Sequence, residues 1–65
     1  MYEYRLYPLD RNNRITGAGI EIVCVSDQAA LRIARARIGT ASAIEVWSRA
    51  RRVGRIEGVK AAIEP

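Results

Sequence analysis

The first stretch of the chain alternates between apolar and polar positions. Tyr2, Tyr4 and Leu6 fall on one side of an extended backbone, and the residues between them fall on the other. A period of two is typical of a half-buried β-strand. Pro8 cannot donate a hydrogen bond to a neighbouring strand, so the pattern predicts that this strand ends there or lies at a sheet edge.

Turn-forming residues follow, and then a second strand pattern begins. Residues 10–13, Asp-Arg-Asn-Asn, bring side chains that bond to nearby backbone, and asparagine tolerates a positive φ. Two glycines within 17–19 interrupt the pattern and indicate a bulge or a loop. Residues 20–25 are the most β-prone part of the chain and are apolar on both sides. We therefore expect an inner strand that is covered, at least in part, on both faces.

A helix is predicted over residues 28–38. Ser26 or Asp27 can cap its N-terminus, and Gly39 stands where a left-handed C-cap is expected. A helical wheel collects one apolar arc, made of Ala30, Leu31, Ile33, Ala34 and Ile38. The opposite arc holds Arg32, Arg35 and Ala36, with Arg37 nearer to the apolar arc. The small alanines on the apolar arc allow the helix to pack closely on a sheet.

A second hairpin is expected after the helix. Residues 43–47 alternate, with Ile44 and Val46 on one side and Glu45 and Trp47 on the other, and residues 52–56 form a return strand. The order of elements is then ββαββ, which predicts an α+β fold with an antiparallel sheet of three to four strands and one helix on one face. We expect a single domain over residues 1–57 and a C-terminal tail, 58–65, that frays or docks on a partner.

The length of the chain limits its stability, and its sequence pattern indicates its location. With 65 residues, a single domain buries only about 60% of the surface of its unfolded chain, so its core is marginal. Cys24 has no disulfide partner, and the chain has no histidine for a zinc site, which leaves self-association as the common remedy. Cys24 itself is expected to be a small buried apolar residue. No signal peptide or membrane-spanning run is visible, so we expect a cytoplasmic protein without a membrane partner.

The positive charge belongs to the second half of the chain. The formal net charge is +4, and residues 32–56 carry seven arginines against one glutamate. Ten of the eleven basic residues are arginine, whose planar fork suits phosphate and carboxylate. A high genomic GC content also produces an arginine bias without any ligand, so both explanations stay open.

Several short motifs resemble those of one protein group. Tyr4-Arg5-Leu6-Tyr7, Asp10, a capped alanine-rich helix, Glu45-Val46-Trp47 and Arg51-Arg52-Val53 follow in order. This order is similar to that of short uncharacterised bacterial proteins, of alphaproteobacterial type, with a Y-R-L-Y start and a closing E-[VL]-W-x-x-x-R-x-V hairpin. The resemblance covers roughly residues 2–56 and implies a common fold but no established function. Two features differ from the group, which often has glycine where Asn13 stands and often has acidic helices.

An enzymatic function is not expected. The commonest general base, histidine, is absent, and neither Cys24 nor any serine has a basic partner that would activate it. The segment Gly17-Ala18-Gly19 lacks the Gly-Lys-Ser/Thr of a phosphate-binding loop and precedes a strand. We therefore predict no catalytic residue, no cofactor and no metal site.

Two binding functions remain. The first is a protein-interaction module, most simply a homodimer formed through its sheet, with an aromatic interface. The candidate interface residues are Tyr2, Tyr4, Tyr7 and Trp47. The alternative is a basic nucleic-acid-binding protein, whose arginines contact phosphates while an aromatic side chain stacks on a base. The candidate residues for this alternative are Arg32, Arg35, Arg49, Arg51, Arg52 and Arg55. For Trp47 a place in the core of the monomer is an equal alternative.

Overall fold

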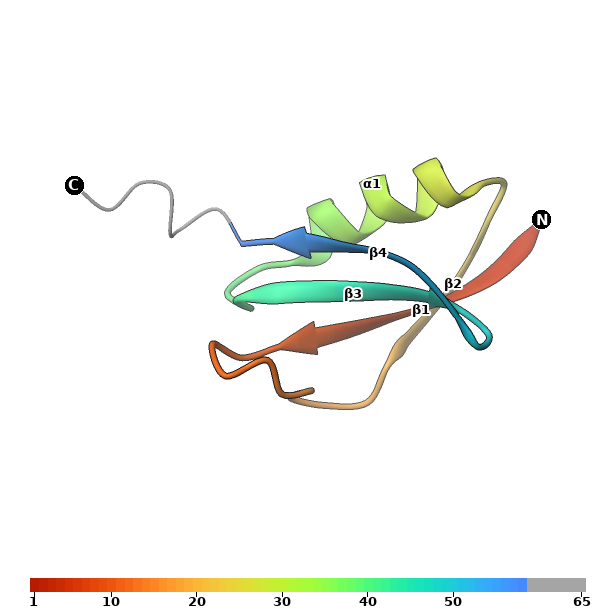
Figure 1. Cartoon of the computed structure of the whole chain (residues 1–65). Helices are drawn as coiled ribbons and strands as arrows, with labels where there is room; N and C mark the ends of the chain where they lie inside the picture. The colour runs from red at the N-terminus through yellow and green to blue at the C-terminus, as the bar shows by residue number, and fades with distance from the viewer. Residues whose placement is uncertain (59–65) are drawn as a thin grey trace.

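The fold is one antiparallel sheet with a single helix on one face (Figure 1). A computed structural model describes residues 1–58. The elements are β1 (Tyr2–Leu9), β2 (Ile20–Cys24), α1 (Asp27–Arg37), β3 (Ala43–Ser48) and β4 (Arg51–Glu57). The predicted ββαββ order and the α+β class are confirmed, and the sheet, predicted to have three to four strands, has four. The predicted tail, 58–65, falls almost entirely outside the described residues.

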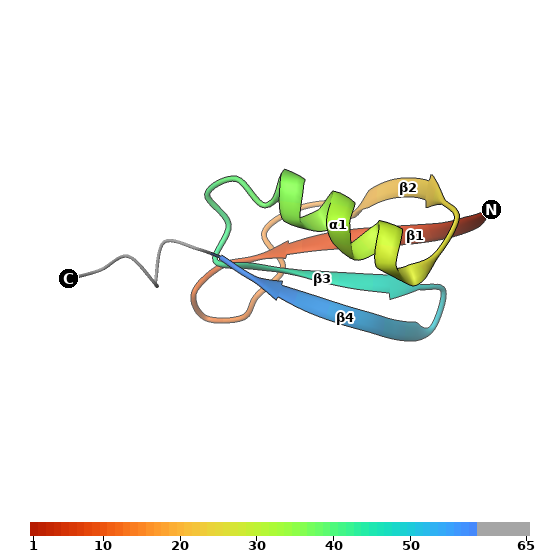
Figure 2. The same ribbon diagram turned by 90° about the horizontal axis from the view of Figure 1, so that it is seen from above.

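The N-terminal strand occupies the middle of the sheet, whose order is β2-β1-β3-β4. On one side Tyr4 of β1 pairs with Ile22 of β2, and on the other side Leu6 pairs with Val46 of β3. The helix connects β2 to β3 across the top of β1, as Figure 2 shows from above. This crossover places β2 on one side of β1 and the β3–β4 hairpin on the other, and every neighbouring pair of strands is antiparallel.

The prediction from Pro8 needs a correction, because β1 is central and continues through Pro8 to Leu9. Pairing with β2 stops at Leu6, and the carbonyl of Pro8 accepts a hydrogen bond from the amide of Thr16 at 3.0 Å on that side. The amide nitrogen and carbonyl of one strand residue face the same neighbour. The missing N–H of proline therefore faces the loop, and the ladder to β3 loses no hydrogen bond.

The prediction that residues 20–25 form an inner strand is wrong. In the described residues β2 pairs with β1 alone and is an edge strand. Ile20, Ile22 and Cys24 face the helix, whereas Val23 and Val25 are 57% and 65% exposed. Apolar residues on both sides of a strand predict cover on both faces. Here the second face of this strand has no cover within the described part of the chain.

The helix follows its predicted boundaries within one residue. Ser26 is the N-cap, and its Oγ accepts a hydrogen bond from the amide of Ala29 at 3.1 Å. Gly39 has a φ of +54°, the left-handed conformation expected just after the helix. Ala30 and Ala34 are fully buried against the sheet, while the side chains of the opposite arc are exposed.

One core lies between the helix and the sheet. Its buried members are Tyr4, Leu6, Cys24, Ala30, Ala34, Ile38, Ile44, Val46 and Ile56. The buried position of Cys24 confirms its expected role as a small apolar residue. At Gly54 of β4 the helix comes so close that an added Cβ would lie 3.0 Å from Cδ2 of Leu31. Leu31 therefore marks the flank of α1 that faces β4.

The second hairpin closes with a two-residue turn, Arg49-Ala50, between the paired residues Ser48 and Arg51. Arg49 has a φ of 58°, a left-handed value that is unfavourable for a side chain with a Cβ atom. A bulge leaves Val53 unpaired, because Trp47 pairs with Arg52 while Val46 pairs with Gly54.

Among the described residues, no helix is both long and apolar enough to cross a membrane.

Candidate interaction surfaces

The open face of the sheet carries charged side chains around two partly buried aromatic rings. Arg5 and Tyr7 of β1 point to this side, since Tyr4 and Leu6 point into the core. Glu45 accepts hydrogen bonds from Nε1 of Trp47 at 3.1 Å and from Nη1 of Arg52 at 3.3 Å. The indole N–H therefore has a partner inside the monomer. The open face is thus mainly polar, with Trp47 held in place by its own strand.

Tyr7 is also packed within the monomer. A Cβ atom added at Gly19 would lie only 2.8 Å from Cε1 of Tyr7, so the ring rests directly on the glycine backbone just before β2. An aromatic ring over a glycine shields a stretch of backbone that has no side chain of its own. Tyr7 and Trp47 thus share the open face, as the predicted interface required, but both make contacts inside one copy of the chain.

Tyr4 does not belong to an exposed surface, because it is 2% exposed and lies on the helix side of the sheet. Its hydroxyl donates a hydrogen bond to Oδ1 of Asp27 at 2.8 Å, and Arg51 donates two more to the same carboxylate, at 3.1 and 3.3 Å. Three residues from β1, the first turn of α1 and the start of β4 are joined in this way. The cluster ties the helix N-terminus to the sheet.

The ionisation of this cluster follows its contacts. Burial, and then the hydrogen bond to Asp27, raises the pKa of Tyr4 to about 12. The hydrogen bonds from Arg51 and then from Tyr4 lower the pKa of Asp27, although partial burial opposes them. The hydrogen bond to Asp27 in turn raises the pKa of Arg51. The arrangement favours a neutral tyrosine beside an ionised carboxylate and guanidinium, which is a structural role.

Tyr2 lies with a different group of residues, at the free end of the β1–β2 pair. It pairs with Cys24, and the next residue of β1, Glu3, pairs with Val23. Four of the five exposed large apolar side chains of the described residues gather at this end, namely Met1, Tyr2, Val23 and Val25. We call β2 and these side chains the β2 edge. Sequence patterns did not indicate this surface, because they placed residues 20–25 inside the sheet.

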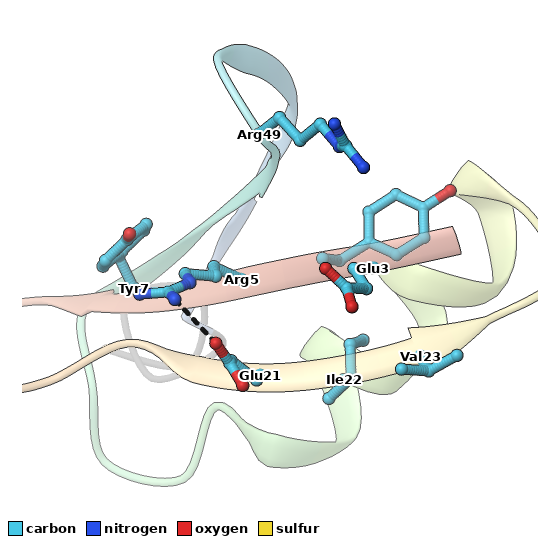
Figure 3. Close-up of a pocket in the computed structure, with 8 residues that line it drawn as sticks. Glu3, Arg5, Tyr7, Glu21, Ile22, Val23 and Arg49 are labelled. Carbon is cyan, nitrogen blue, oxygen red and sulfur yellow. Dashed lines mark hydrogen bonds and ion pairs between the residues drawn. The ribbon is translucent and has the colours of Figure 1, made fainter. Parts of the chain in front are cut away.

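A shallow hollow of about 460 Å³ lies on the open face beside β2 (Figure 3). Its polar lining includes Glu3, Arg5, Glu21 and Arg49, and Arg49 reaches over it from the β3–β4 turn. Arg5 and Glu21 form an ion pair across it at 2.6 Å. Both signs of charge are therefore present and partly neutralise each other. No group of three or more metal-ligating side chains occurs in the described residues.

The arginines predicted to bind a polyanion fall into two sets. Those of β4 are occupied: Arg51 pairs with Asp27, Arg52 with Glu45 at 3.3 Å, and Arg55 with Glu57 at 2.6 Å. Arg55 also donates to Oδ1 of Asn13 at 2.8 Å. The second set, Arg32, Arg35 and Arg49, forms no ion pair with a carboxylate of residues 1–58. Carboxylates of residues 1–58 therefore neutralise the predicted arginines of β4 but not those of the helix and of the β3–β4 turn.

Comparison with known proteins provides no match. No protein-family model fits the chain, and no curated protein or solved structure shows significant similarity to it. The structure defines the class, a small α+β protein with one helix on a four-stranded antiparallel sheet. The resemblance to short bacterial proteins of unknown function stays a prediction.

Proposed function

We propose that the protein is a non-catalytic interaction module that forms a homodimer by antiparallel pairing of β2 with β2 of a second copy. The observation that carries this proposal is the unprotected β2 edge. An edge strand presents a row of unpaired N–H and C=O groups to any other strand. The marginal core of a 65-residue chain adds a reason, since a dimer brings stability that one copy lacks.

A comparison of the two sheet edges supports β2 as the pairing edge. Edge strands are normally protected by charges, proline or bulges. β4 has this protection, because it carries three arginines and the bulge at Val53. β2 has the sequence Ile-Glu-Ile-Val-Cys, with one charge and no proline, and Val25 follows it directly. Exposed valines beside free backbone groups favour the addition of another strand.

The geometry of two identical strands restricts the register. Partners across an antiparallel pair must lie on the same face of the sheet, so the pairing is centred on a residue. Centring on Val23 places Val23 opposite its copy and Val25 opposite Glu21. This register brings the two exposed Val23 side chains together on the open face, with Val25 just beyond the end of β2, and leaves each Arg5–Glu21 ion pair at the rim. Centring on Glu21 instead brings two carboxylates together, which is unfavourable.

The first test replaces Val23 with lysine. The wild-type chain is expected to have twice the monomer mass of 7.2 kDa by light scattering, and Val23→Lys is expected to have the monomer mass. In the dimer each introduced lysine lies opposite the same lysine of the second copy, and the two charges repel each other. In the monomer the introduced lysine lies opposite Glu3. Ile15→Lys is the matched control, because Ile15 is 56% exposed, almost the same as Val23, and lies outside β2. A monomeric wild type, or a Val23→Lys variant that stays dimeric, contradicts the proposal.

A second test reads the register directly. In a Cys24→Ala background, Val23→Cys should form a disulfide between copies, since directly opposite Cα atoms lie about 4.5–5.5 Å apart. Glu21→Cys should not, because position 21 and its copy are four residues apart along the strands, roughly 13 Å. Trp47→Phe tests the alternative of face-to-face stacking and should leave the dimer intact. Loss of the dimer in Trp47→Phe would move the interface to the open face.

A further inference from the structure

The charges of the protein are divided between its two layers. The open face of the sheet carries Glu3, Glu21, Glu45 and Glu57 beside Arg5, Arg52 and Arg55, and three of these glutamates are in ion pairs. Helix α1 carries Arg32, Arg35 and Arg37, all exposed, and its one acidic residue is Asp27. Asp27 is already bound by Arg51 and Tyr4. The charge exposed on helix α1 is therefore purely positive within the described residues, with Arg32 and Arg35 on the outer arc and Arg37 on the flank nearer the sheet.

The homodimer proposed above places two such surfaces side by side. A two-fold axis that pairs two edge strands in one continuous sheet runs perpendicular to that sheet, so both copies present the same face to the same side. Both helices then lie on one side of an eight-stranded sheet. Six arginines, namely Arg32, Arg35 and Arg37 of each copy, share this side, and the aromatic side chains Tyr7 and Trp47 lie on the other.

The position of the helix sets the spacing. Leu31 faces β4, so the opposite flank of α1, which carries Ile33 and Arg37, faces β2 and the two-fold axis. With strands about 4.8 Å apart and each helix over the middle of its own sheet, the two helices lie roughly 19 Å apart. Figure 2 shows that the helix crosses the middle of the sheet. The basic surface is thus broad, and Arg37 of both copies lies nearest its centre.

We infer that the homodimer binds double-stranded nucleic acid by its phosphate backbone, through the exposed arginines of its two α1 helices. This inference rests on the proposed dimer. Arginine forks match phosphate oxygens, and binding to them depends on charge and not on base sequence. A duplex is favoured over a single strand, because a single strand needs several aromatic side chains on which its bases stack, and within the described residues the helix side exposes Tyr2 alone while Tyr7 and Trp47 lie on the opposite face. The arginines of β4 contribute little, since they are paired with carboxylates.

The test measures fluorescence anisotropy of a labelled 20-base-pair DNA duplex at several salt concentrations. The wild-type dimer should bind with a Kd of about 10⁻⁵ M at physiological salt. Six phosphate contacts predict a slope of about −5 for log K against log salt, and three contacts predict about −3. Val23→Lys should therefore bind more weakly and with a shallower slope than Ile15→Lys. These two variants have the same net charge and differ in their expected oligomeric state.

Two triple variants decide which layer binds. Arg32→Gln with Arg35→Gln and Arg37→Gln should raise the Kd at least about tenfold. The matched control, Arg5→Gln with Arg52→Gln and Arg55→Gln, removes the same charge from the open face and should change the Kd by less than about threefold. An equal loss in both variants overturns the inference, because total charge would then explain the binding.

The outcomes separate the inference from the proposed dimer. A wild-type dimer that does not bind the duplex overturns the inference and leaves the dimer standing. A wild-type monomer overturns both. Equal binding to a single strand of the same length contradicts the duplex, and equal competition by polyglutamate shows a general affinity for acidic chains. Either of these last two results also overturns the inference.

Discussion

Truncation of Leu6 tests whether the stability of the fold depends on one core between the helix and the sheet, with Leu6 at its centre. Leu6 is 0% exposed and lies in the middle of β1, with Ile20 of β2 on one side and Val46 of β3 on the other. It belongs to the same core as Ala30 and Ala34 of the helix. The side chain thus contacts or neighbours every layer of the fold.

The expected loss follows from the size of the side chain and its complete burial. Leu6→Ala removes a fully buried isobutyl group and leaves a cavity, which costs about 3 kcal/mol of the free energy of unfolding. A domain of this length has a total stability of roughly 3–10 kcal/mol. The variant therefore loses at least about 30% of its stability, and at the low end of that range it does not fold.

The measurement is urea unfolding followed by the fluorescence of Trp47, the single tryptophan, at one fixed protein concentration. With a slope of about 1 kcal/mol per molar urea, the midpoint should fall by about 3 M. Leu6→Met keeps the volume and should cost less than about 1.5 kcal/mol. If Leu6→Ala lowers the stability by less than about 1 kcal/mol, the placement of Leu6 at the centre of the core is refuted.

Of three further predictions, two concern the cluster at the helix N-terminus and one concerns the turn of the second hairpin. Because the pKa of Tyr4 is raised from 10.0 to about 12 in the folded state, its contribution to stability is complete below pH 10 and is lost as the pH rises to about 12. Urea midpoints across this range should show a loss in the wild type that Tyr4→Phe lacks. The pKa of Asp27 is lowered in the folded state, so the stability that its carboxylate contributes is present above its ordinary pKa and is lost as the pH falls through the folded pKa. The urea midpoint of Asp27→Asn should therefore fall less in acid than the urea midpoint of the wild type. Arg49→Gly should stabilise the hairpin by up to about 1 kcal/mol, because glycine adopts the φ of 58° without strain, and a lower melting temperature than that of Arg49→Ala would contradict this.

The positions of many single residues of the candidate surfaces could be predicted from the sequence, but not which of these residues lie together. Single arginines on the outer arc of the helix follow from the periodicity of residues 28–38 and are exposed as expected. The sequence places all four candidate aromatic residues on strands and predicts one interface from them. In the structure they separate: Tyr4 is buried under the helix, Tyr7 and Trp47 lie on the open face, and Tyr2 lies at the β2 edge. The alternation of apolar and polar residues shows which residues of one strand share a side. It does not show which sides of different strands lie on the same face of the sheet.

The sequence by itself determined the features that depend on neighbouring residues. The Ser26 cap, the alanine face of the helix and the left-handed Gly39 arise within one or two turns of backbone, where local hydrogen bonds and side-chain periodicity dominate. Only the tertiary structure decided the order of the strands, and this order depends on pairings between residues far apart in the chain. β1 became central because the crossover of α1 brought β3 to its free side, and this left β2 as an exposed edge. The same apolar run, Ile20 to Val25, is compatible with an inner or an edge strand, and the position of β3 decides between them.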